Sequence, residues 1–79
     1  MINLDNKRFV LNDNTTYEVI EYVTYDNKIY VYLVNVDDEI DSDFKELLNF
    51  NGELYLNDID SNLFESKIYN LFLEKFRKY

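Results

Sequence analysis

The sequence predicts an α+β domain in which a small antiparallel β-sheet of three or four strands packs against a C-terminal α-helix. Two patterns support this fold class. Strand-forming residues flank a polar turn at Asp26-Asn27, and apolar residues recur at helical spacing from Phe64 to Tyr79. The chain has 79 residues, enough for one domain, 1–79. A helix lying across the sheet would bury the apolar face of each.

The first half of the chain predicts three strands, at residues 7–11, 16–25 and 29–36. Asn12-Asp13-Asn14 separates the first two as a turn, because Asn and Asp tolerate left-handed backbone conformations. A two-residue loop at Asp26-Asn27 would pair Tyr25 with Lys28, Val23 with Tyr30 and Val19 with Val34, whereas a three-residue loop would change this register. Both faces of this hairpin are apolar, so alternation leaves open which one faces the core.

The middle of the chain predicts an acidic loop followed by a short helix. Residues 37–43 are too acidic for a core element. Asp43 and Glu46 have the spacing of a capping box, which favours a short helix over about 43–50 that ends at Asn51-Gly52. A strand over 44–48 is the competing interpretation. Residues 53–59 alternate well enough to form a strand.

The last segment has the clearest helical pattern. Its apolar stripe consists of Phe64, Ile68, Leu71, Phe72, Phe76 and Tyr79. Asp60, Ser61 and Asn62 each suit the N-cap position. Lys75, Arg77 and Lys78 oppose the negative end of the helix dipole, so much of the positive charge here has a local structural explanation.

Composition argues against catalysis and against a bound cofactor. The chain contains neither Cys nor His, which excludes a disulfide framework, a thiolate metal site and the commonest general base. Glu18 and Glu21 are the candidates for paired-carboxylate chemistry, but a chain this short offers little cleft. We therefore expect a non-enzymatic protein with no cofactor and no metal.

The acidic run has the ligand spacing of a calcium-binding EF-hand loop. Oxygen-bearing side chains stand at loop positions 1, 3, 5, 7, 9 and 12 between Asn35 and Glu46. However, Ile40 occupies the sixth position, where the sharp turn needs Gly. A solvated acidic loop is the preferred interpretation of this segment.

Charge is the strongest indication of function. Residues 1–60 hold 14 acids and four bases, and the whole chain has a net charge of −8. We expect the partner-binding residues to be Asp37, Asp38, Glu39, Asp41 and Asp43, with Glu18 and Glu21 contributing. Such a surface can imitate a phosphate backbone, which predicts a basic host protein, such as a nucleic-acid-binding effector, as the partner. Direct binding to nucleic acid is disfavoured by the negative field. The competing interpretation is that the acidity only keeps the protein soluble.

No targeting segment or membrane span is predicted. The longest continuous apolar run, Ile29 to Val34, is six residues long. The expected location is the cytoplasm.

Three segments carry a resemblance to known proteins: Tyr17 to Val34, Gly52 to Ile59 and the closing helix. Together they resemble short acidic proteins of unknown function from Gram-positive bacteria, phages and mobile elements. The resemblance implies a mobile-element context, in which inhibition of a host defence nuclease is a known role. In composition the chain is also similar to anti-CRISPR proteins. The alternative function is a small oligomer, including a homodimer, or an adaptor that uses an aromatic surface made by Tyr22, Tyr30, Tyr32 or Tyr55.

Overall fold

The computed structural model describes residues 4–11 and 13–78. It has an α+β fold in which five antiparallel strands, each next to its neighbour in sequence, are followed by a helix. The strands are β1 (Arg8–Val10), β2 (Thr16–Tyr25), β3 (Lys28–Asn35), β4 (Asp38–Phe50) and β5 (Glu53–Asn57). The helical segment comprises α1 (Ser61–Leu63), a π-helical turn η1 (Phe64–Ile68) and α2 (Tyr69–Phe76).

The hairpin of β2 and β3 confirms the predicted turn and part of the predicted register. Asp26 and Asn27 both have positive φ, as a type I′ turn requires, and Tyr25 lies opposite Lys28. The register shifts between Val19 and Glu21, so Val19 lies opposite Leu33 and not opposite Val34 as predicted. The extra residue, Ile20, forms a β-bulge, which turns Val19 to the opposite face of the sheet from Val23.

The predicted short helix over about 43–50 is wrong, because this segment belongs to strand β4. The sheet accordingly has five strands, not three or four. Asn51 and Gly52 have φ of 53° and 88°, so they form a second hairpin turn and do not cap a helix. β4 also includes Asp38 to Asp43, most of the segment predicted as a loop.

The two faces of the sheet carry separate cores. The helix core consists of Val23, Tyr30, Ile68 and Phe72. The inner core, on the face that the sheet encloses by its own curl, consists of Leu4, Val19, Val31, Leu33 and Leu47. Both faces of the β2–β3 hairpin are therefore buried, which resolves the ambiguity left by its two apolar faces.

The C-terminal helix confirms the predicted stripe and one of the predicted caps. The Asp60 carboxylate accepts a hydrogen bond from the Leu63 backbone N–H at 3.0 Å, which makes Asp60 the N-cap. Ile68 and Phe72 are fully buried, and the other described members of the stripe pack around them. Tyr79 and Asn12, which belong to the predicted stripe and turn, lie outside the described residues.

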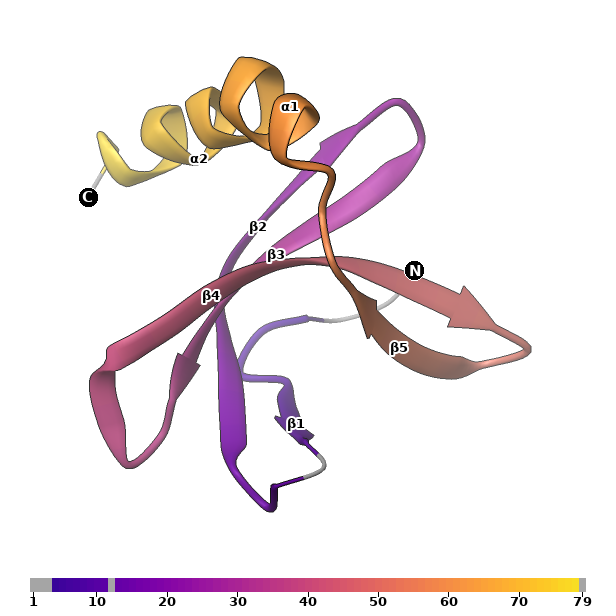
Figure 1. Ribbon diagram of the computed structural model, residues 1–79, viewed down its shortest axis with the longest axis vertical. Helices are drawn as coiled ribbons and strands as arrows, with labels where there is room; N and C mark the ends of the chain where they lie inside the picture. Colours follow the sequence, from indigo (N-terminus) through magenta and orange to yellow (C-terminus); the bar gives the residue numbers. More distant parts are fainter. Residues whose placement is uncertain (1–3, 12, 79) are drawn as a thin grey trace.

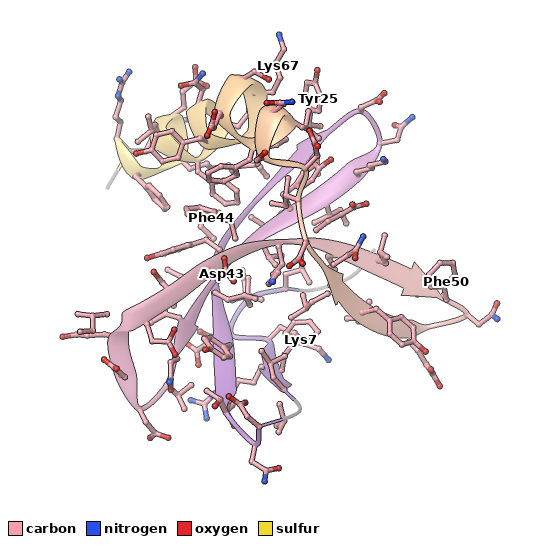
Figure 2. The ribbon with its side chains drawn as sticks, viewed as in Figure 1. Lys7, Tyr25, Asp43, Phe44, Phe50 and Lys67 are labelled. Atoms are coloured by element: carbon pink, nitrogen blue, oxygen red, sulfur yellow. The ribbon has the colours of Figure 1, made fainter. Side chains whose placement is uncertain are left out.

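The elements are arranged so that the helix covers only part of the sheet. In Figure 1, the helix lies over the end of the sheet that contains the β2–β3 turn, and β4 crosses beneath it. Phe44 lies between β4 and the helix in Figure 2, with its ring centroid 4.9 Å from those of Phe64 and Phe72. The β3–β4 turn lies at the far end of the sheet, away from the helix. That end is where the predicted acidic site is located.

The helix core generates a stability prediction. Replacing Phe72 by Ala should lower the free energy of unfolding by about 3–5 kcal/mol, because the ring is fully buried between Phe44 and Phe76. Urea unfolding followed by circular dichroism measures the change. Asn70→Ala, on the exposed side of the same helix, is the control and should stay within about 0.5 kcal/mol of the parent. Equal effects of the two substitutions would show that the helix does not pack on the sheet in this orientation.

Candidate protein-binding site at the acidic end of the sheet

The β3–β4 hairpin ends in an irregular segment that presents acids to solvent. Val34 lies opposite Ser42, but the next residue, Asn35, lies opposite Asp38, so Glu39, Ile40 and Asp41 form an extra bulge in β4. Side chains fix the turn locally. The Asn35 amide oxygen accepts from the Asp37 N–H at 2.9 Å, and the Asp38 carboxylate accepts from the Ile40 N–H at 3.3 Å. The acids therefore project from an ordered hairpin.

Asp41 anchors this bulge to the rest of the sheet. Its carboxylate oxygen Oδ2 accepts a hydrogen bond from the Tyr17 hydroxyl at 2.7 Å and another from Asn35 Nδ2 at 3.1 Å. These bonds link β4 to β2 and β3. The hydrogen bond to the Asp41 carboxylate is the main cause that raises the pKa of Tyr17 to about 12. Asp41 thus has a structural role and is only half exposed.

Of the seven predicted acids, Asp37, Asp38 and Glu39 combine solvent exposure with the absence of a described ion pair. All three are exposed. Within the residues that the structure describes, none of them forms an ion pair with a Lys or Arg. We call these three residues, together with Glu18, the acidic end.

Glu18 lies at the border of this group. It forms an ion pair with Arg8 at 3.0 Å, and its side chain is 25% exposed. A shallow hollow of about 230 Å³ is lined by both Glu18 and Glu39, which places them on the same side of the sheet. Glu18 therefore adds to the acidic end with part of its charge offset by Arg8.

Asp43 and Glu21 lie elsewhere, each beside a lysine. Asp43 is 3.5 Å from Lys45, which also forms an ion pair with Asp58, and Figure 2 shows Asp43 in the middle of β4. The hydrogen bond to Asp58 and the charge of Asp43 raise the pKa of Lys45 against the opposing effect of burial. Glu21 is 3.8 Å from Lys75 of the helix, and its side chain is only 14% exposed. The seven predicted residues are therefore not one cluster.

Sequence reasoning missed the apolar side chains that accompany the acidic end. Ile40 is 88% exposed, Ile20 is 47% exposed and Val36 is 40% exposed. Ile20, Val34 and Val36 line the same hollow as Arg8, Glu18 and Glu39, and Ile40 follows Glu39 in the chain. We call Ile20, Val34, Val36 and Ile40 the apolar patch. In the sequence, this patch is indicated by Ile40, a branched apolar residue that stands alone in an acidic run.

The chemistry available elsewhere in the chain is limited. Among residues 4–11 and 13–78, no group of three or more acidic side chains could hold a metal ion. The EF-hand spacing is laid out along a strand and a hairpin turn, which separates the carboxylates that a calcium loop would gather. In the same part of the chain, no helix has the length and apolar character needed to cross a membrane.

No protein-family model matches the chain, and no curated protein or solved structure shows significant similarity to it.

The anchor at Asp41 generates a prediction about alkaline pH. Because the pKa of Tyr17 is raised to about 12 in the folded protein, the folded state keeps this proton above pH 10 while the unfolded state loses it. Stability from the hydrogen bond should be complete below pH 10 and should fall between pH 10 and 12. Tyr17→Phe should be less stable at neutral pH and should lose less stability over this interval. Thermal unfolding at pH 8 to 12 measures both effects.

Other groups also titrate in this range, so the comparison with the variant is essential. Burial raises the pKa of Tyr30, and the hydrogen bond to Glu53 raises that of Tyr55. Both groups remain in Tyr17→Phe and supply the background. Identical pH profiles for parent and variant would contradict the assigned hydrogen bond.

Proposed function

We propose that this is a non-enzymatic binding protein that docks its acidic end onto a basic surface of another protein. Within the mobile-element context that the sequence resemblance implies, the proposed partner is a nucleic-acid-binding host protein. The protein would act as an inhibitor, of the anti-CRISPR or another anti-defence type, by occupying the surface that contacts phosphate groups.

The observation that carries this proposal is the exposure of Ile40 beside exposed carboxylates that form no ion pair, on a hairpin held by Asp41. Protein interfaces commonly have an apolar centre surrounded by a polar rim. Ile20, Val34 and Val36 share one hollow with Glu18 and Glu39, and Asp37, Asp38 and Ile40 flank Glu39 in the chain. Ile40 is 88% exposed and adds little to the core, so its side chain is available to be buried against a partner.

Charge supports a basic partner. The chain has a net charge of −8, and Asp37, Asp38 and Glu39 are consecutive and solvated. Three adjacent carboxylates repel one another, which slightly destabilises the hairpin, but they attract a cationic surface and accelerate its association. The acids would therefore set the encounter rate, whereas the apolar patch would set the lifetime of the complex.

The alternative function is an oligomer or adaptor that acts through an aromatic surface. Of the four tyrosines expected on that surface, two are exposed. Tyr30 is only 1% exposed, and Tyr32 packs against Phe44 and Phe76. Tyr22 and Tyr55 remain exposed, and Tyr55 lies beside Phe50 with ring centroids 6.0 Å apart. Sedimentation at several protein and salt concentrations separates the two functions, because an aromatic dimer should be insensitive to salt.

Neutralising the acidic end should slow partner binding. We expect the triple variant Asp37→Asn, Asp38→Asn, Glu39→Gln to lower the association rate by about tenfold or more at low salt, with a weaker salt dependence. The partner is first captured from a bacterial lysate by the parent protein, identified and purified. Surface plasmon resonance between 50 and 300 mM salt, a range over which the Debye length falls from above to below about 10 Å, then measures the rates.

A second triple variant controls for total charge. Asp26→Asn, Glu65→Gln, Glu74→Gln removes the same charge from exposed positions on the β2–β3 turn and the helix. It should leave association close to that of the parent. Equal slowing by both triple variants would mean that net charge, not the acidic end, governs binding.

The apolar patch generates a separate prediction. Ile40→Ser should raise the dissociation rate by about tenfold, in the range of a centrally placed contact, while leaving the association rate unchanged. The same purified partner and the same kinetic measurement apply. The melting temperature should not change, because Ile40 is 88% exposed. A variant that dissociates as slowly as the parent would show that the acids bind without an apolar centre.

A further inference from the structure

The hollow at the acidic end combines an apolar lining with carboxylates, which is what a long cationic side chain needs. We propose that it receives one arginine side chain of the basic partner, and that Arg8 of this chain competes with that arginine for Glu18. The inference rests on the proposed function, because the partner supplies the arginine. Binding of small arginine compounds can be measured without the partner, so the two proposals can fail separately.

The hollow forms where the helix stops covering its face of the sheet. α2 ends at Phe76, whose ring packs edge-on against Tyr32 with the centroids 5.5 Å apart. Along β3, Val34 is the next residue on the same face, because alternate residues of a strand point to the same side. In Figure 1, the helix does not extend over the β3–β4 turn beyond this point. The face therefore continues past the helix as the uncovered hollow.

The apolar part of the lining consists of Ile20, Val34 and Val36. Ile20 is 47% exposed and Val36 is 40% exposed, so both have apolar surface left to bury. The hollow has a volume of about 230 Å³. This is smaller than typical small-molecule sites, which measure about 300–1,000 Å³. A hollow of this size suits one long side chain, and the aliphatic stem of an arginine would be buried against these three residues.

The charged part of the lining comes from a row across the sheet and from the β3–β4 hairpin. Glu18 lies opposite Arg8 of β1 on one side and opposite Val34 of β3 on the other, so the three share a face. Glu39 lines the hollow from the hairpin. The charged lining residues are thus two acids and one base, and the two residues that precede Glu39 in the chain are also acids. The local charge therefore favours a cation.

Arg8 shows that this lining can hold a guanidinium group. Its Nε donates a hydrogen bond to Glu18 Oε1 at 3.0 Å, and its side chain is 60% exposed. Within the described residues, the other carboxylate oxygen of Glu18, Oε2, accepts no hydrogen bond. Exposed ion pairs of this kind are weak. An incoming arginine therefore meets a carboxylate that is only partly engaged and that can exchange its partner.

Two properties favour arginine over lysine in this hollow. Guanidinium presents its donors in a planar fork that can reach more than one carboxylate, whereas the lysine ammonium is a compact point charge. Glu18 and Glu39 supply two carboxylates to the same hollow. Guanidinium is also less strongly hydrated, so it loses less when it enters a site with an apolar lining.

Nα-acetyl-arginine amide is the probe. In ¹H–¹⁵N NMR titrations of the parent protein, we expect saturable shifts at Glu18, Ile20, Val36 and Glu39. Nα-acetyl-citrulline amide keeps the stem without the charge, and methylguanidinium keeps the charge without the stem. Each should bind at least about threefold more weakly, the factor expected when one exposed ion pair or a small apolar contact is lost.

These comparisons need no change to the protein. Equal binding by methylguanidinium would overturn the proposal, because it would show attraction to charge alone. Equal binding by Nα-acetyl-lysine amide would overturn the choice of arginine. Shifts at the same residues that depend on protein concentration without the probe would indicate a second copy of the chain as the occupant, and would overturn the assignment to a partner.

Arg8→Gln tests the competition for Glu18. The substitution releases the Glu18 carboxylate, so the variant should bind the arginine probe about threefold more tightly. Lys7→Gln is the control, because it removes the same charge from the neighbouring exposed residue, which does not line the hollow. Equal tightening by both substitutions would overturn the competition, since the change in net charge would account for it. A purely structural role of Arg8 predicts no tightening.

The triple variant of the acidic end separates this inference from the proposed function. If that variant slows association of the partner but the arginine probe does not bind the hollow, the inference fails and the proposed function stands. If the probe binds the hollow but the triple variant and its charge control slow the partner equally, the proposed function fails and the arginine site stands.

Discussion

The structure depends on one constraint: both faces of the β2–β3 hairpin are apolar and both must be covered by a chain of 79 residues. The helix covers one face near the turn, where Tyr30 packs with Ile68 and Phe72. No second helix is present among the described residues, so the sheet covers its other face by curling around Val31 and Leu33. The bulge at Ile20 lets one continuous strand, β2, contribute to both cores. It turns Val19 toward the inner core while Val23 stays under the helix.

The same constraint leaves two places where the sheet is neither covered by the helix nor closed on itself. The helix is too short to reach the far end of the hairpin, so the side that it covers near Val23 is exposed near Val36. The curl brings β1 and β5 to one cavity without pairing them. The acidic end lies where coverage by the helix stops, and this cavity lies where closure by the sheet stops. Phe9, Leu54 and Leu56, which line this cavity, also pack against the inner core.

The sequence predicted those parts of the fold that depend on local signals. The Asp26-Asn27 turn, the strand pairing beside it and the helical stripe from Phe64 to Phe76 are set by residues close in sequence. The Ile20 bulge was not predictable in this way, because it follows from the need to cover two faces at once. At 43–50 the local signals conflict. The spacing of Asp43 and Glu46 favours a helix, but Asn51-Gly52, flanked by alternating apolar residues, is the stronger signal and predicts a hairpin. Phe44 and Leu47, three residues apart, serve opposite faces of a strand and not one face of a helix.

For the candidate site, the sequence predicted the acidic residues but not which of them the fold engages and which it leaves exposed. Asp41 is bound by Tyr17 and Asn35, contacts that come from two other strands and have no local signature. Asp43 and Glu21 lie beside lysines brought close by folding. What remains is the run from Asp37 to Glu39, where carboxylates repel one another and stabilise nothing in the described structure beyond the turn itself. Repulsion among these carboxylates and the exposed Ile40 beside them are the two features that the proposed partner surface would account for.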